Sequence, residues 1–264
     1  MGASCNCSKS TDNIKEVVAV TSPSGLPRSA AAEGGSTEDL AVYKRDNTSS
    51  MHKKVLELYS TALLQTPPGL TSFKLTTLKA KDKDWAHLFI LLTHCGRLQR
   101  LHLWKVTISA KSLDQLGNQL VALTQLEYLM LADMSLASYD LTRLSDGFKG
   151  LVRMRELILT VNYISADHLT VLLPGLMMMR DLEVLVLDEN ELGNKGSEVV
   201  AGLLEKLKRV RDVSLKFNSV GHKGLVALVP WVTRRRGLVV RLDGNDLNDD
   251  EYDLLEQAHL DAAA

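Results

Sequence analysis

The chain has few cysteines, no long apolar run and almost no net charge. Its three cysteines, Cys5, Cys7 and Cys95, show no spacing typical of a disulfide framework, so we expect a reducing compartment. The 31 basic and 32 acidic residues leave a net charge of -1 and give no global electrostatic reason to bind nucleic acid. No stretch approaches the roughly 18 apolar residues of a membrane-spanning helix. A secretory signal is also missing from the amino terminus, so we expect a cytoplasmic protein.

The sequence also lacks the common catalytic motifs. It contains no Gly-rich phosphate loop, no HExxH helix and no nucleophile elbow. The seven histidines are scattered, and none has ligand spacing with a carboxylate. We therefore expect no catalytic residue, no metal site and no cofactor, and we predict that the protein is not an enzyme.

The first seven residues, MGASCNC, resemble a lipidation signal. Removal of the initiator methionine would expose Gly2 to N-myristoylation, and Cys5 and Cys7 could then be palmitoylated. The signal departs from its consensus at Asn6, where Ser or Thr is preferred. Two alternatives are an incidental sequence in a disordered start and a Cys-x-Cys metal site, which would need more ligands than this segment supplies.

Stable anchoring requires a second signal, because one myristoyl chain binds a membrane only marginally. A basic patch cannot supply it, since Lys9 and Lys15 are offset by Asp12 and Glu16. Palmitoylated cysteine is then the remaining candidate. We expect a peripheral protein on the cytoplasmic side of a membrane, with the plasma membrane and a flagellar membrane as candidates.

Residues 1–50 form a compositionally distinct head. They contain nine Ser, four Thr, four Gly and two Pro, and only two of the chain's 48 leucines. Such a segment cannot bury enough apolar surface to offset its ordering entropy. We predict a disordered tether with a root-mean-square span of roughly 40 Å.

The remainder of the chain repeats every 28 residues. A block of the form L-x-x-L-x-L begins at each of seven positions: Leu70, Leu98, Leu126, Met154, Leu182, Val210 and, one residue early, Gly237. Eight residues after the start, the last four blocks carry an asparagine: Asn162, Asn190, Asn218 and Asn245. The first three blocks carry apolar residues there, namely Leu78, Val106 and Met134, so we expect their turns to be built differently.

These columns resemble the ribonuclease-inhibitor-type leucine-rich repeats. The resemblance implies an α/β solenoid, with a curved parallel sheet on the concave side and helices on the convex side. Repeats would occupy residues 70–248, with an amino-terminal capping helix at 51–69 and a carboxyl-terminal capping helix at 249–264. Caps are expected because the end repeats of a solenoid otherwise expose core.

Strand alternation predicts which residues face the concave side, at two, four and six places after each block start. Apolar residues gather in the middle of these columns, which should otherwise be solvated: Tyr128, Met130, Ile158, Val184 and Val186. Trp104 flanks them. The predicted polar rim comprises Arg100, His102, Lys105, Asp188, Glu189 and Asp212. Exposed apolar surface of this kind favours partner binding; the alternatives are coverage by the amino-terminal tail or a simple preference for strand-forming residues.

The sequence thus predicts a monomeric, lipid-anchored adaptor that binds a protein partner on its concave face. The alternative function is regulation of an enzyme, as in ribonuclease inhibitors and activators of the GTPase Ran, which share this repeat class. Neither relative transfers residue by residue. The inhibitors are longer and rich in cysteine, and the activators have an acidic tail and more repeats.

Overall fold

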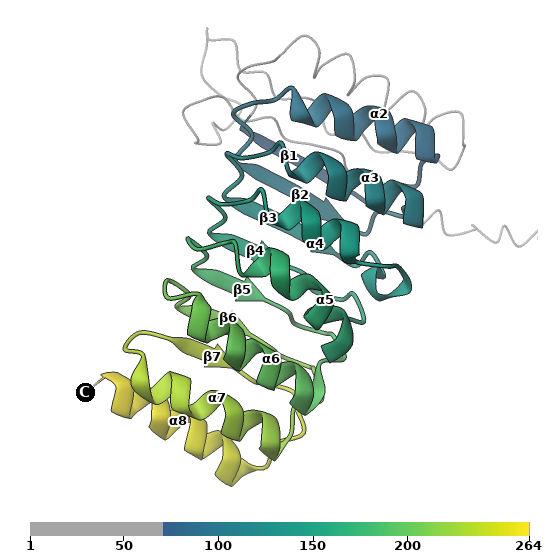
Figure 1. The fold of residues 1–264 in the computed structure, drawn as a ribbon. Helices are drawn as coiled ribbons and strands as arrows, with labels where there is room; N and C mark the ends of the chain where they lie inside the picture. Colours follow the sequence, from purple (N-terminus) through teal and green to yellow (C-terminus); the bar gives the residue numbers. More distant parts are fainter. Residues whose placement is uncertain (1–70, 264) are drawn as a thin grey trace, which may run out of the picture.

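The computed structural model describes residues 71–263 (Figure 1). The predicted tether at 1–50, its lipidation residues Gly2, Cys5 and Cys7, and the predicted amino-terminal cap at 51–69 lie outside the described residues. The repeat domain can be followed from its first strand to its last helix.

Seven parallel strands form one sheet in simple chain order. They are β1 (Ser72–Thr76), β2 (Arg100–Trp104), β3 (Tyr128–Ala132), β4 (Glu156–Ile158), β5 (Val184–Val186), β6 (Asp212–Ser214) and β7 (Val239–Arg241). The register places each residue beside the one in the same column of the next repeat, as in the series Leu75, Leu103 and Leu131. The 28-residue period in the sequence is therefore the distance along the chain from one strand to the same point in the next.

A helix follows every strand and lies on the same face of the sheet (Figure 1). These helices are α2 (Asp82–Thr93), α3 (Ala110–Leu120), α4 (Thr142–Phe148), α5 (Ala166–Leu176), α6 (Gly193–Lys206), α7 (His222–Arg234) and α8 (Asp249–Ala263); a short 3-10 turn, η1 (Leu136–Ser138), precedes α4. Each helix packs on the next one along the chain. The predicted leucine-rich-repeat solenoid of the α/β class is confirmed.

Columns of leucine fill the space between the sheet and the helices. Leu75, Leu103 and Leu131 have no exposed surface, and the helix residues opposite them, such as Leu116 and Leu144, are equally buried. Burying one such side chain contributes about 1.5–3 kcal/mol. No repeat could bury its leucines alone, so stability comes from stacking of neighbours.

An asparagine ladder closes the turns that follow the strands. The Asn190 side-chain oxygen accepts from the backbone amides of Asn162 (3.1 Å) and Ile164 (2.9 Å), and its nitrogen donates to the carbonyls of Leu159 and Leu187, both at 2.9 Å. Each asparagine therefore serves the preceding repeat as well as its own. Buried backbone groups need such partners because they cannot reach water.

The same ladder serves the third repeat, although this repeat lacks its own asparagine. The Asn162 side-chain oxygen accepts from the amides of Met134 (3.0 Å) and Leu136 (3.4 Å). All seven repeats also place one residue in the left-handed region just after the strand: Thr77, Lys105, Asp133, Val161, Glu189, Phe217 and Gly244. The expectation that the first three turns are built differently is wrong for this backbone position. The third repeat takes its acceptor from the next asparagine, as the later repeats do, so an asparagine in place of Met134 would serve the second repeat.

Candidate protein-binding surface

The sheet face opposite the helices, hereafter the open face, presents the residues predicted for partner binding. Its middle row runs across the strands through His102, Met130, Ile158 and Val186, each beside the next in register. Neighbouring strands lie about 4.8 Å apart, so the last three side chains form a continuous apolar strip. All three are half-buried, which leaves part of each accessible.

A second row, through Tyr128, Glu156 and Val184, is not apolar throughout. Tyr128 and Val184 do not touch through register, because Glu156 lies between them on β4. Tyr128 is instead joined to the strip through Met130, whose sulfur accepts a hydrogen bond from the tyrosine hydroxyl at 3.6 Å. The five predicted apolar residues thus share one surface, with a carboxylate set into it.

Tyr128 is held from its other side by a cation. The guanidinium carbon of Arg100 lies 4.0 Å from the centre of the Tyr128 ring, which is a cation–π contact. Burial raises the pKa of the Tyr128 hydroxyl, with a smaller contribution from Glu156, while Arg100 acts in the opposite direction. Arg100 and Met130 therefore hold the ring in place, and tyrosine is a residue type enriched in interface hot spots.

His102 stands beside this pair and is uncharged. Burial, with Lys74 and Arg100 nearby, lowers its pKa to about 4. Its Nε2 atom is buried with no hydrogen-bond partner in the described part of the chain. Trp104, at the end of the same strand, is 44% exposed and lies in register with Ala132, so its ring has no bulky neighbour on that side.

The predicted rim has a chemistry that the sequence did not reveal. Asp212 pairs with Arg241, and the Asp188 carboxylate accepts from the backbone amide of Lys216 at 3.0 Å, so both carboxylates already have partners within the solenoid. The Lys105 Nζ atom lies 4.0 Å from the Asp133 Oδ2 atom. Glu189 is exposed. Of the predicted acidic rim, Glu189 is the residue most available to a partner.

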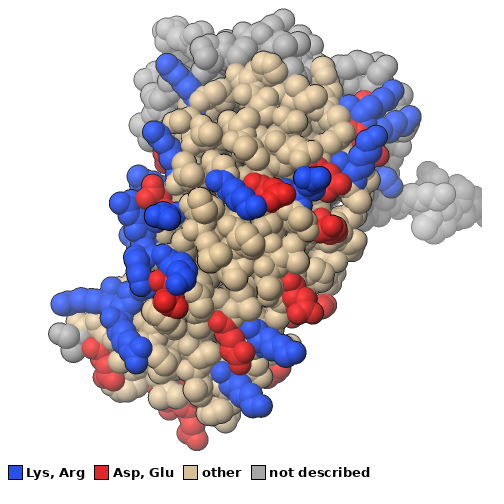
Figure 2. Space-filling view, in the orientation of Figure 1, with Lys and Arg blue, Asp and Glu red and all other residues tan. Residues whose placement is uncertain are grey.

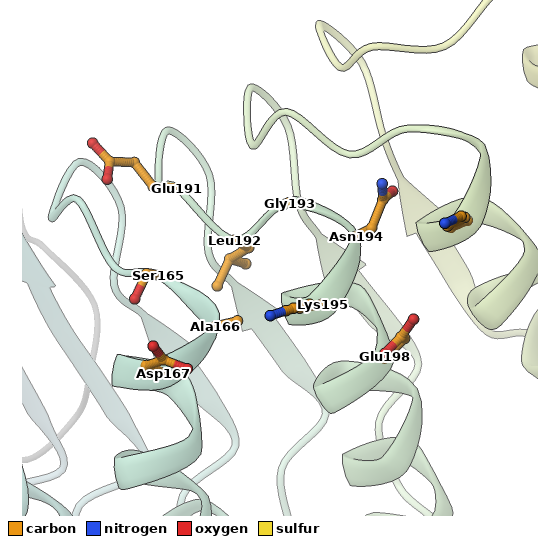
Figure 3. Close-up of a pocket in the computed structure, with 10 residues that line it drawn as sticks. Ser165, Ala166, Asp167, Glu191, Leu192, Gly193, Asn194, Lys195 and Glu198 are labelled. Atoms are coloured by element: carbon orange, nitrogen blue, oxygen red, sulfur yellow. The ribbon is translucent and has the colours of Figure 1, made fainter.

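Two depressions lie among the loops and first helical turns that follow β4, β5 and β6. The larger, of about 610 Å³, is lined by the first residues of α5 and α6, including Ser165, Asp167 and Lys195 (Figure 3). Ser165 caps α5 through a reciprocal bond with His168. The charges around this depression are mixed, and no ligand chemistry follows from them.

The smaller depression, of about 560 Å³, contains residues that sequence reasoning missed. Tyr163 and Phe217 are 56% and 58% exposed on its sides. A signal was present in the sequence: Tyr163 occupies a column that is otherwise polar or charged, whose members are Lys79, Thr107, Ser135, Glu191, Ser219 and Asp246. An aromatic residue in such a column has no core to fill.

The helix-covered face also carries exposed apolar side chains, among them Ile90, Val171 and Val226, which lie on three separate helices. Figure 2 shows basic and acidic side chains in scattered groups on this face, with uncharged surface between them. Within residues 71–263, no group of three or more His, Cys, Asp or Glu side chains could hold a metal ion. The helices in this part of the chain are also too short or too polar to cross a bilayer.

Comparisons with known proteins returned structural likeness only. No family model and no curated protein matches the chain. A solved protein from Bacteroides fragilis aligns with 75% of this chain and 73% of its own, at 12% identity and a TM-score of 0.41. An internalin from Listeria monocytogenes aligns with 80% of this chain and 85% of its own, at 13% identity and a TM-score of 0.30. The fold assignment therefore rests on the sheet and repeats of this chain.

Proposed function

We propose that the protein is a non-catalytic scaffold that binds a partner protein on its open face. The observation that carries this proposal is the apolar strip of Met130, Ile158 and Val186, joined to Tyr128 and left accessible on a sheet. Large contiguous apolar surfaces on soluble proteins mark interaction sites.

The topology of the sheet supports the same conclusion. Parallel sheets usually have both faces covered, because their crossover connections place helices on both sides. Here helices cover one face, and in the described range no helix lies on the other. A protein partner would complete the missing layer, with Arg100, Tyr128 and Trp104 as anchors of the types enriched in interface hot spots.

The proposal is tested by quantitative capture from cells that express the full chain. Tyr128→Glu with Ile158→Glu places two carboxylates on the apolar strip. The control is Val171→Glu with Val226→Glu, two exposed valines on the helix-covered face. The open-face variant should lose at least one partner that the control retains, with similar melting temperatures for both. If every captured protein is retained by the open-face variant, the site assignment is wrong.

We also propose that acyl chains on Gly2, Cys5 and Cys7 hold the scaffold on the cytoplasmic side of a membrane. The support is the amino-terminal sequence together with the absence of a basic patch near it. The test is membrane fractionation of the full chain beside Gly2→Ala and Cys5→Ser with Cys7→Ser. Loss of the membrane fraction in both variants supports the anchor, and retention in Gly2→Ala contradicts it.

A further inference from the structure

The smaller depression on the loop edge has the composition of a cation-binding site. We call it the aromatic–acidic notch; it is lined by Val161, Tyr163, Glu189, Asn190, Glu191 and Phe217. These residues come from the turns that follow β4, β5 and β6. The notch therefore adjoins the open face but uses residues that the open face does not, apart from Glu189.

The two aromatic side chains of the notch contribute little to the stability of the fold. Phe217 and Tyr163 are more than half exposed, so their rings contribute little burial to stability. Both residues have positive φ angles, 53° for Phe217 and 57° for Tyr163. Left-handed backbone costs an L-residue roughly 1–2 kcal/mol. At the Tyr163 position the other repeats have polar or charged residues, and at the Phe217 position they have polar residues, valine or glycine, so the solenoid does not require aromatic rings there.

The Phe217 ring is nevertheless held in a defined place. A Cβ atom at Gly244 would lie 2.2 Å from Cε1 of the Phe217 ring, so the ring packs directly over the glycine backbone. The Phe217 amide also donates to the carbonyl of Asp243 at 3.0 Å. The adjacent repeat thus supports the ring while its other side remains in solvent. A ring fixed in this way binds with little loss of side-chain entropy.

The acidic residues of the notch are not neutralised by the chain. Within residues 71–263 neither Glu189 nor Glu191 forms an ion pair, whereas Lys216 pairs with Asp243 at 2.8 Å. Figure 3 shows Glu191 pointing away from the first turn of α6, where Lys195 lies. Two free carboxylates next to two aromatic rings attract a cation, because the face of an aromatic ring carries a negative electrostatic potential.

We propose that the aromatic–acidic notch binds an arginine side chain of a peptide segment in a partner protein. The planar guanidinium can stack on an aromatic ring and donate to carboxylates at the same time, which an ammonium group does less well. The preference for arginine follows from the residues of the notch alone. The expectation that this arginine belongs to a protein rests on the proposed function of the open face. Glu189 then has a role at the junction of the two surfaces.

The test is fluorescence anisotropy of the full chain with a labelled peptide Gly-Ser-Gly-Arg-Gly-Arg-Gly-Ser. Matched peptides replace both arginines with citrulline, which keeps the shape and removes the charge, or with glutamate. Loss of one exposed cation–π contact weakens binding about two- to fivefold. We expect that loss for Phe217→Leu, which keeps an apolar side chain without a ring. The citrulline peptide should lose more, because it gives up the charge-assisted bonds to the carboxylates as well. Glu189→Gln with Glu191→Gln should weaken binding at least as much as Phe217→Leu does.

The control variants separate this site from its surroundings. Glu198→Gln removes a carboxylate from the adjoining depression, and Tyr128→Glu with Ile158→Glu disrupts the open face; both should bind the arginine peptide as the unmodified chain does. Equal binding of the arginine and citrulline peptides overturns the proposal. So does Phe217-dependent binding to phosphatidylcholine vesicles without binding of the peptide. Failure of the notch would leave the capture result for the open face unchanged.

Discussion

Arg100 and Tyr128 sit side by side on strands β2 and β3, with the guanidinium carbon 4.0 Å from the ring centre. The tyrosine hydroxyl in turn donates to the Met130 sulfur. These two contacts join a cation, an aromatic ring and an apolar side chain into one unit on the open face. Because the unit is already ordered in the free chain, a partner that binds it does not have to immobilise the ring.

Asn190 is predicted to be essential to the stability of the turns. Asn190→Leu removes the acceptor for the amides of Asn162 and Ile164 and leaves buried carbonyls without a donor. We expect the free energy of unfolding to fall by about 3 kcal/mol. Urea denaturation followed by circular dichroism measures this change.

Met134→Leu is the matched control, because Met134 occupies the asparagine column of the third repeat and is already apolar. This substitution should lower the free energy of unfolding by less than about 1.5 kcal/mol. Equal losses for Asn190→Leu and Met134→Leu would mean that volume, and not hydrogen bonding, determines stability in this column.

Gly147 is predicted to set the close approach of α3 and α4. A Cβ atom at Gly147 would lie 2.3 Å from the carbonyl oxygen of Gly117, so Gly147→Ala must push the helices apart. We expect a loss of about 2 kcal/mol in the free energy of unfolding. Gly202→Ala is the control: its Cβ meets nothing within 4 Å in α6, and it should gain about 0.5–1 kcal/mol from helix propensity. Stabilisation by both substitutions would refute the packing argument.

His102 is predicted to make the fold sensitive to acid. Its pKa is about 4 in the folded chain against an ordinary 6.5. Between these values the unfolded chain binds a proton that the folded chain does not, so this contribution to stability is present above pH 6.5 and is lost as the pH falls toward 4. Urea midpoints for His102→Gln should fall less steeply with pH than those of the unmodified chain. The exposed His87→Gln should follow the unmodified chain; identical slopes for all three would contradict the assignment to His102.

Much of the fold could be predicted from the sequence because the repeat makes it local. Once the 28-residue phase is known, each strand residue has a fixed neighbour, and the register from Leu75 to Leu103 follows. The direction of the asparagine ladder could not be predicted. Asn162 serves the turn of Met134 as well as its own, and this depends on how adjacent repeats are offset, which a column alignment does not contain.

The sequence predicts which residues lie on the candidate surface, but not which of their side chains pair with one another. Alternation along a strand placed Met130, Ile158 and Val186 on one face, and the structure has them adjacent in register. The pairing of Asp212 with Arg241 depends on side-chain conformation across strands. The aromatic–acidic notch does not follow from the repeat pattern, because Tyr163 and Phe217 are the aromatic exceptions in their turn columns.

The central claim is that the open face binds a partner protein, and site-specific photocrosslinking in cells tests it most directly. A benzoylphenylalanine residue replaces Ile158 in one full-length chain and the exposed Val226 of α7 in another. The account predicts a discrete crosslinked species with another protein from position 158 and none of that mass from position 226. Crosslinks from position 158 only to residues 1–50 of the same chain, or equal products from both positions, would contradict it.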